Sequence, residues 1–501
     1  MSEKLNIIRK SLFLDSVALM RISKQLYGIE GVQEAALMMG TPANKNILKD
    51  ADLLTNDAAS ASGADLIIAI KALDKKFLSA ALKVANELLD HPHKEKGHDS
   101  LWRPKSIRSA VNSAPGSNFV LISVPGEYAA AEARKALKKG LNTMVFSDNV
   151  SLEEERELKL YARDKGLFVM GPDCGTAIIN GVPLAFANSV PDGDVGIIGA
   201  SGTGTQEVST LIARAGGGVS HAIGVGGRDL NDEVGGLSTL QAIEALEDDP
   251  KTRQIIIISK PPGPKTVHKI ISLISKKKKK YTLCFLGGRD IELPSNACQS
   301  TTLFDAAAQT GFSISQPEPR EIAKILPRLN GNVLGLFCGG TLASEARVIV
   351  AKKTAGTLYK HCPTKKFSQH SNERYFQMLD LGDDLYTRGR PHPMIDPTIR
   401  QEHIRKACEQ DGIGLLLIDV ILGYGSSDNP AESVVDCLQK RVNGSPIIIA
   451  SVTGTETDPQ RRSEQIRILE EAGITVAQSS SHGAYITAEC MNLSSKENNV
   501  K

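Results

Sequence analysis

The sequence predicts an α/β protein of several domains built on parallel sheets. Apolar strands, turns containing Gly, Ser or Thr, and amphipathic helices alternate along the chain, which is typical of parallel sheets covered by helices. Glycine is frequent (44 residues) and aromatic residues are few (4%), as expected where helices pack closely on strands. At about 150 residues per domain, the 501 residues predict three or four domains.

Two domains are expected before residue 193, over residues 1–105 and 106–192. The strands and helices expected in the first are Asn6–Ile8, Asp15–Tyr27, Val32–Met39, Leu66–Ile70 and Lys75–Leu89. A polar, Pro-containing linker follows at His91–Lys105, where a solvated loop explains the histidines best. The elements expected in the second domain are Phe119–Val124, Glu127–Lys139, Thr143–Phe146, Leu152–Lys165 and Leu167–Met170.

Two further domains are expected over residues 193–315 and 330–490. Between them lies Gln316–Arg328, which contains three prolines and indicates a boundary. The strands expected in these domains are Val195–Ile198, Ile255–Ser259, Leu283–Leu286, Val333–Phe337, Leu415–Val420, Pro446–Ser451 and Thr475–Ala477.

Charge and hydropathy narrow the class of protein. The chain has 59 Lys and Arg against 57 Asp and Glu, a net charge of +2, which argues against a strongly basic nucleic-acid binder. No apolar run reaches the roughly 18 residues that a membrane-spanning helix needs, and Met1–Lys10 lacks the apolar segment of a signal peptide. We therefore expect a cytoplasmic protein whose partners include neither nucleic acid nor a membrane.

Cysteines and histidines show no metal-ligand spacing. The eight cysteines are scattered without a CxxC pair, and the ten histidines form no HExxH-type cluster. Several cysteines lie in apolar strands, where a free thiol usually acts as a small buried side chain, and Cys174 is the one for which we expect another role. The sequence predicts no metal site.

Two glycine-rich turns are the most informative motifs. In VGIIGASGTGTQEV (Val195–Val208) a buried strand ends in small residues and a helix follows at once, and VLGLFCGGTLASEA (Val333–Ala346) repeats this pattern. Small residues let a backbone approach a ligand, and free N–H groups at a helix N-terminus favour an anion. Neither turn has the P-loop GK[ST] or GxGxxG, so no nucleotide is specified, and a tight turn without a ligand explains one copy equally well. Because there are two, we expect both helix N-termini to face one anionic group.

A third segment concentrates charge. LDLGDDLYTRGRPHPMIDPTIR (Leu379–Arg400) places charged residues among Gly and Pro residues that disfavour a regular helix. Charged groups in such a loop are often functional, and a surface network of salt bridges is the alternative. Its candidates are Asp383, Asp384, Arg388, Arg390, His392 and Asp396.

These segments carry a resemblance to known families. Val195–Val208, IGVGGRDLND (Ile223–Asp232), Glu244–Thr252 and GPDCG (Gly171–Gly175) are similar to the α subunit of succinyl-CoA synthetase, and residues 333–489 are similar to the carboxy-terminal domain of its β subunit. The motifs MMGTPANK, ISVPGEYAA, FSDNVSLEEE, GPDCGTAIINGVPLAFAN and GRPHPMIDPT resemble the FdrA family over nearly the whole chain. The resemblance implies a Rossmann-like CoA-binding-type domain at 106–192, followed by flavodoxin-like domains of the synthetase α type (193–315) and β type (330–490).

The chain departs from the synthetases in three places. Those enzymes carry a phosphorylated His in a GHAGA-type loop, and the matching loop here, GGRDIELPSNACQS (Gly287–Ser300), has no His. The segment that would hold the supporting Glu reads SKPPG, with Lys260 near its place. No ATP-grasp domain is present, and SLFLDSVALM stands where a glycine-rich loop would bind the phosphates of CoA.

The FdrA resemblance implies a subunit of a carbamoyltransferase in purine (allantoin) catabolism. Such a protein would move a carbamoyl group between oxamate, or a similar small acid, and phosphate, with carbamoyl phosphate or phosphate as a ligand and no required cofactor. Other protein subunits of a hetero-oligomer would be its partners. One alternative is the CoA-binding subunit of an acyl-CoA synthetase that works with a separate ATP-grasp protein, the only case in which CoA is expected. The other is a non-catalytic scaffold that binds a metabolite.

Residue roles follow from the leading hypothesis. The residues expected to bind phosphate are Ser201, Gly202, Thr203, Gly204, Gly339, Gly340 and Thr341. Arg390 or Arg388 would neutralise a carboxylate or a developing oxyanion, and His392 or Asp396 would transfer a proton. The residues expected to contact the substrate are Asn149, Asp173, Cys174 and Arg388.

Overall fold

The computed structural model describes residues 2–12, 14, 16–90, 104–362, 374–387, 392–409, 412–438 and 446–498. The chain divides into two compact units. The first consists of Met1–Leu141 with Asp384–Pro391, and the second of Asn142–Asp383 with His392–Lys501.

The first unit begins with an antiparallel sheet. Strands β1 (Glu3–Arg9), β3 (Leu66–Ala72) and β2 (Val32–Met39) lie in the order β1-β3-β2, and both pairings are antiparallel. The parallel sheet expected here is therefore wrong. The apolar strand β3 lies between β1 and β2 and is buried along nearly its whole length. Strands β1 and β2 therefore do not pair with each other.

Helices complete the first unit. The helices are α1 (Ser16–Tyr27), α2 (Pro42–Asp50), η1 (Ala58–Ser60), α3 (Lys75–Asp90), α4 (Ile107–Ser113), α5 (Gly126–Leu137) and α13 (Asp384–Thr387), and β4 is Phe119–Ile122. Leu78, Ala81, Ala85 and Leu89 form the buried face of α3, and the same core contains residues of α1 and β3. Helix α13 lies in the charged segment where no regular helix was expected.

The second unit begins with two short parallel strands, β5 (Asn142–Val145) and β6 (Val169–Met170), joined by α6 (Leu152–Asp164). Ser151 caps α6 in a reciprocal arrangement with Glu154, which satisfies amide groups of the first turn.

A seven-stranded sheet follows, in the order β13-β12-β11-β9-β10-β7-β8. Its strands are β7 (Thr176–Ile179), β8 (Val182–Ala185), β9 (Asp192–Gly199), β10 (Val219–Gly224), β11 (Gln254–Ser259), β12 (Lys280–Phe285) and β13 (Ala297–Ser300). Strands β9 to β13 pair in parallel, whereas β7 is antiparallel to β8 and β10. The β7–β8 hairpin therefore belongs to this sheet, although it precedes the boundary expected at residue 192. Its helices are α7 (Gly202–Arg214), α8 (Leu237–Asp248), α9 (Pro264–Ile274) and α10 (Leu303–Ala308).

The last sheet has six strands, in the order β15-β16-β14-β17-β18-β19, and all its pairings are parallel. The strands are β14 (Asn332–Phe337), β15 (Tyr359–His361), β16 (Arg374–Asp380), β17 (Ile413–Ile421), β18 (Ile447–Thr453) and β19 (Thr475–Ala477). The helices are α11 (Pro319–Ile325), α12 (Gly340–Lys353), α14 (Thr398–Glu409), α15 (Pro430–Val435), η2 (Asp436–Leu438), α16 (Arg462–Glu471) and α17 (Ser480–Asn498).

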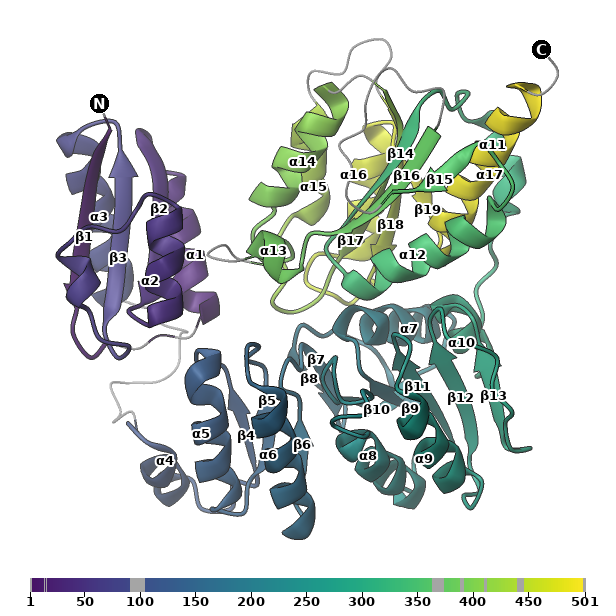
Figure 1. The fold of residues 1–501 in the computed structure, drawn as a ribbon, viewed down its shortest axis with the longest axis horizontal. Coiled ribbons are helices and arrows are strands. Elements are labelled where there is room, and N and C mark those ends of the chain that lie inside the picture. The colour runs from purple at the N-terminus through teal and green to yellow at the C-terminus, as the bar shows by residue number, and fades with distance from the viewer. Residues whose placement is uncertain are drawn as a thin grey trace. The chain divides into compact units, whose positions relative to one another are not determined.

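One apolar core joins the two large sheets of the second unit. It contains Val208 and Leu211 of α7 together with Leu342 and Ala346 of α12, and these two helices contact each other between the sheets (Figure 1). Each helix follows the first strand of its parallel core, so each begins at the carboxyl edge of a sheet. Ligands of open α/β sheets bind at this edge, where the strand order reverses.

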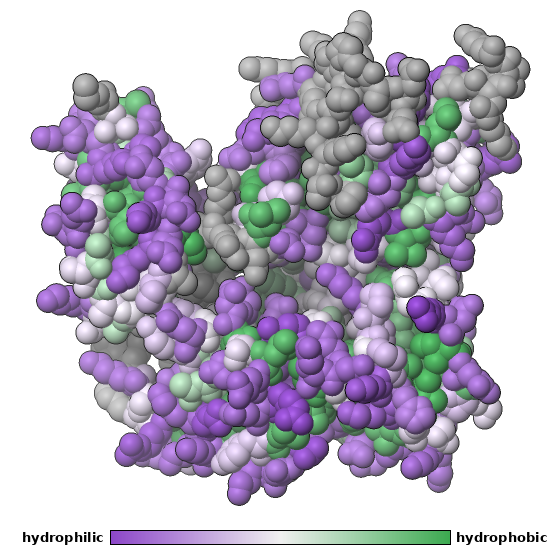
Figure 2. All heavy atoms as spheres, in the orientation of Figure 1, coloured by the Kyte–Doolittle hydropathy of each residue, from purple (hydrophilic) through white to green (hydrophobic). Residues whose placement is uncertain are grey.

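The surface shows no large apolar area on the face drawn in Figure 2. The face in Figure 2 is mainly hydrophilic, with apolar residues in separate small groups. Among the described helices, none is both long and apolar enough to span a bilayer.

Candidate functional site

Helix α7 begins at the first glycine-rich turn. Ser201 is its N-cap, and the Ser201 Oγ accepts a hydrogen bond of 2.9 Å from the N–H of Gly204. The backbone at Ala200 is anchored on the neighbouring strand, because its N–H donates to the carbonyl of Ile258 at 2.9 Å. The first amide groups of the helix are thus presented at a fixed place on the sheet edge.

Helix α12 begins at the second turn, with Gly339 as its N-cap. At this turn the carboxylate of Asp419, on β17, accepts hydrogen bonds from two backbone amides. The donors are the N–H groups of Cys338 at 2.8 Å and Gly339 at 2.9 Å. Asp419 is fully buried, and burial raises its pKa, an effect opposed by the charge of Arg400. The expected role of the Gly339 N–H as a phosphate donor is therefore wrong, because Asp419 occupies it.

The two turns meet directly. Ser201 Oγ donates to Thr341 Oγ1 at 2.6 Å, across 140 positions of sequence. A Cβ added to Gly339 would lie 2.8 Å from Thr203 Oγ1, and one added to Gly204 would lie 3.2 Å from the Thr341 methyl carbon. A side chain at either position would crowd the side chains of the opposing turn, so glycine lets the two turns approach closely.

Several donors of the joined turns remain available. The N–H groups of Gly202, Thr203, Gly340 and Thr341 lie in first helical turns, where no intrahelical acceptor exists. The hydroxyl of Thr341 accepts from Ser201, and its own hydrogen has no acceptor among the residues the structure describes. Two positive helix ends and a hydroxyl donor suit an anion.

Asp380, at the end of β16, lies against the start of α12. A Cβ on Gly340 would come 2.1 Å from Asp380 Oδ2, and the other carboxylate oxygen accepts the N–H of Gly382 at 3.0 Å. Burial raises the pKa of Asp380 to about 6, although the charge of Lys260 and the Gly382 hydrogen bond act in the opposite direction. Asp380 is therefore charged at pH 7 and half protonated near pH 6.

His392 lies beside the same carboxylate. A Cβ on Gly382 would be 2.5 Å from His392 Nε2 and 3.2 Å from Asp380 Oδ1. The His392 Nδ1 accepts the N–H of Met394 at 3.3 Å, which assigns the proton to Nε2. Burial lowers the pKa of His392 to about 4, so at pH 7 the ring is a neutral hydrogen-bond donor.

Asp396, another predicted residue of the charged segment, is held by contacts within its own turn. Asp396 accepts both the N–H of Thr398 (3.0 Å) and its hydroxyl (2.6 Å), which ties its carboxylate to the start of α14. Arg388 and Arg390 lie outside the described residues, so their roles stay predictions.

Asn149, Asp173 and Cys174 lie in loops that follow β5 and β6. Asn149 and Asp173 are exposed and have positive φ (55° and 57°), and the Asp173 N–H donates to Ser147 at 2.9 Å. The Cys174 side chain is buried and its thiol donates to the Gly224 carbonyl at 3.3 Å, while burial raises its pKa to about 12. An inert thiol of this kind packs within the fold and does not face a substrate.

Sequence reasoning missed Asp380, Asp419 and Lys260 as members of the site. A usable signal existed, because all three lie at or near the carboxyl ends of strands that flank the glycine-rich turns. Over the described residues, no group of three or more His, Cys, Asp and Glu side chains could hold a metal ion.

Three protein-family models match parts of the chain. The AllF heavy metal-associated domain matches residues 1–103, the CoA binding domain matches 191–287 and the CoA-ligase domain matches 336–488. The CoA-binding match lies one domain later than the 106–192 expected for that type. Residues 1–103 contain no cysteine, the ligand that soft heavy metals prefer.

One relative covers almost the whole chain. The uncharacterized protein YahF of Escherichia coli (strain K12) is 37% identical over 504 residues, which is 96% of this chain and 98% of that protein.

Other relatives are CoA-ligase subunits that match in part. Succinate–CoA ligase [ADP-forming] subunit alpha of Methanothermobacter thermautotrophicus is 28% identical over 28% of this chain and 48% of its own length. The ADP-forming sulfoacetate-CoA ligase subunit SqwL of Acholeplasma sp is 28% identical over 34% of this chain and 58% of its own length. The matched region thus spans about half of each ligase subunit.

A solved structure also matches over much of the chain. The acetyl-coenzyme A synthetase 1 of Ca. Korarchaeum cryptofilum, in complex with phosphate and ADP, covers 83% of this chain and 94% of its own at 16% identity. Its TM-score of 0.32 is too low to support an inference.

Proposed function

Because the chain belongs to the family of YahF and contains CoA-binding and CoA-ligase domains, we propose that it is a subunit of an acyl-CoA ligase that binds an acyl phosphate between α7 and α12. The observation that carries this proposal is the 2.6 Å hydrogen bond between Ser201 and Thr341, which joins two helix N-termini into one donor group. Ligase-subunit relatives support this function better than carbamoyl transfer, to which the sequence pointed first.

The phosphate group would lie against the N–H groups of Gly202, Thr203, Gly340 and Thr341. These donors and the Thr341 hydroxyl would stabilise the charge of the phosphate leaving group as the thiol of CoA attacks the acyl carbon. A carbon–sulfur bond forms and the carbon–oxygen bond to phosphate breaks, which gives acyl-CoA and free phosphate. Neutral His392 would donate its Nε2 hydrogen to an oxygen of the substrate, and Asp380 would accept the thiol proton.

A separate subunit would carry out the ATP-dependent step that forms the acyl phosphate. Both ligase relatives are named as subunits, which supports a hetero-oligomeric assembly. When acyl phosphate is supplied directly, the transfer of its acyl group to CoA needs no ATP-using subunit. This chain can therefore be assayed alone.

Carbamoyl transfer remains a second candidate because one observation favours it. The loop Gly287–Ser300 has no His to carry phosphate, so the site would have to use a free phosphorylated metabolite. Carbamoyl phosphate is itself an acyl phosphate and would use the same donors.

One assay separates the two functions. The purified chain is incubated with succinyl phosphate or acetyl phosphate plus CoA, and in parallel with carbamoyl phosphate plus oxamate. The ligase proposal predicts phosphate release that requires CoA and falls at least tenfold in Thr341→Val. Release that requires oxamate and ignores CoA would replace it with carbamoyl transfer, and the absence of both would leave a binding subunit without catalysis.

A further inference from the structure

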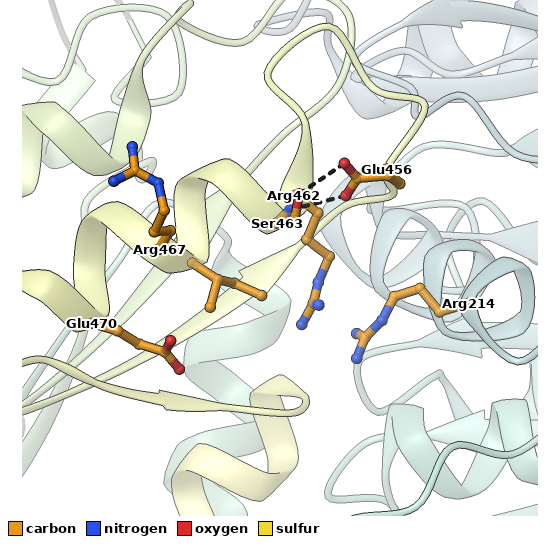
Figure 3. A pocket seen from close by; sticks show the side chains of 7 residues that line it. Arg214, Glu456, Arg462, Ser463, Arg467 and Glu470 are labelled. Carbon is orange, nitrogen blue, oxygen red and sulfur yellow. Dashed lines mark hydrogen bonds between the residues drawn. The ribbon is translucent and has the colours of Figure 1, made fainter.

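A pocket lies at the end of α7 opposite to Ser201, within the second unit. It has a volume of about 300 Å³ and lies between the last turn of α7 and one side of α16. Arg214 and Arg462 extend into it from these two helices (Figure 3). Helix α7 has 13 residues, so at 1.5 Å per residue its two ends are roughly 20 Å apart. The pocket is therefore separate from the Ser201–Thr341 site.

Within the described part of the chain, neither arginine has a carboxylate partner. Arg214 Nη2 donates weakly to Gln478 Oε1 at 3.4 Å, and its Nη1 is buried with no hydrogen-bond partner in the described part of the chain. Arg462 Nε donates to the Val452 carbonyl at 3.1 Å. Neither guanidinium lies within 4.0 Å of a carboxylate oxygen of the described residues. Unpaired buried charges are costly.

A third arginine at the pocket shows the contrast. Arg467 contacts Glu464 and Glu471, each at 2.6 Å, and is largely exposed. Its charge is therefore already neutralised on its own helix.

The surrounding carboxylates do not neutralise the pair. Glu207 accepts from the Thr453 hydroxyl and, at 2.9 Å, from the Ser480 N–H. Glu456 accepts from the N–H and hydroxyl of Ser463, as the dashed lines in Figure 3 show. Burial lowers the pKa of Arg462 to about 10, and the charge of Arg214 adds to this effect although Glu207 and Glu456 oppose it. Among the residues that line the pocket, Arg214, Arg462 and Arg467 stand against Glu456 and Glu470, so the lining carries one positive charge in excess.

We propose that this pocket binds a phosphate group, free or carried by a small metabolite, between the guanidinium groups of Arg214 and Arg462. Each guanidinium offers a planar pair of N–H donors that matches two phosphate oxygens, and a doubly charged anion neutralises both cations at once. Since Arg214 belongs to α7 and Arg462 to α16, the bound group would connect the helices that cover the two sheets.

The test is calorimetric titration of the whole chain with inorganic phosphate. Arg214→Gln and Arg462→Gln should each weaken phosphate binding in this pocket at least 20-fold. The control Arg467→Gln should change that affinity less than twofold. Both pocket variants should melt no lower than the parent protein without phosphate, because removing one like charge relieves repulsion. Undiminished phosphate binding in both variants would overturn the proposal.

Further arms identify the ligand and keep the two sites apart. Thr341→Val should leave the phosphate binding that depends on Arg214 and Arg462 unchanged. A failure of this pocket proposal can therefore be told apart from a failure of the proposed function. Glucose 6-phosphate replaces phosphate in a parallel titration: an affinity equal to or higher than that of phosphate assigns the site to a phosphorylated metabolite, and a lower one to free phosphate. An Arg-dependent affinity for malonate that exceeds the affinity for phosphate would overturn the assignment to a phosphate group.

Discussion

Asp380 shows how one residue controls the charge of the candidate site. Its carboxylate lies beside Gly340 at the N-terminus of α12, where it competes with an incoming anion. The described charged residues that act on it are Lys260, Asp383 and Asp419. Because its pKa is about 6, the competing charge is present at pH 7.5 and largely absent at pH 5.5.

We therefore predict that anion binding strengthens on acidification. Sulfate is the probe because it stays a dianion over this range, and its affinity should rise several-fold from pH 7.5 to pH 5.5. Asp380→Asn should bind sulfate tightly at both pH values, and the neutral control Gln377→Asn should keep the parent dependence. The Asp380 assignment fails if Asp380→Asn retains the same pH slope. His392 does not interfere, since its pKa of about 4 lies below the window.

At the scale of elements, most strands could be predicted because buried parallel strands are continuous apolar runs. Ile255–Ser259, expected as a strand, is β11 (Gln254–Ser259), and Thr475–Ala477 is β19 as expected. The antiparallel pairing of the first sheet could not be predicted from the sequence. The spacing of β1, α1 and β2 is the same whether β1 and β2 pair with each other or β3 lies between them. The meeting of Ser201 with Thr341 was also hidden, since it depends on how α7 packs on α12.

The contact between α12 and the start of α10 makes a testable prediction about stability. Glu345 of α12 is buried, with Oε1 accepting from the Leu303 N–H at 2.6 Å, and burial raises its pKa to about 8. The folded state therefore holds a proton that the unfolded state releases near pH 4.5, so this residue's contribution to stability falls as pH rises from 4.5 to 8.

Replacing that carboxyl by a neutral amide should remove the dependence. At pH 8.5 Glu345→Gln should raise the free energy of unfolding by at least about 1–2 kcal/mol, because the shift from 4.5 to about 8 spans several pKa units of about 1.4 kcal/mol each. Urea denaturation at pH 6 and pH 8.5 measures it, with the exposed Glu244→Gln as the matched control. A loss of stability at pH 8.5 would mean that Glu345 is charged and paired in the folded protein.

For the whole molecule, the proposed chemistry uses a free acyl phosphate and no phosphohistidine on this chain. The loop Gly287–Ser300 contains no His, so incubation with ATP or an acyl phosphate should leave no acid-labile phosphohistidine on the chain. Mass spectrometry of the intact protein checks this, with a succinyl-CoA synthetase α subunit as the positive control. Stoichiometric phosphate on a histidine would show that the group is transferred through the chain and not held as a free metabolite.

The central claim is that Ser201 and Thr341 form one anion site, and a double-mutant cycle of phosphate binding tests it most directly. Calorimetry is done in an Arg462→Gln background, with Ser209→Ala as a control on the same helix. Ser201→Ala and Thr341→Val should each weaken binding about tenfold, the equivalent of about 1.4 kcal/mol. The double variant should be less than twofold weaker than either single variant, because the two hydroxyls act through one shared hydrogen bond. Losses that simply add, or single variants that bind normally, would contradict a composite site.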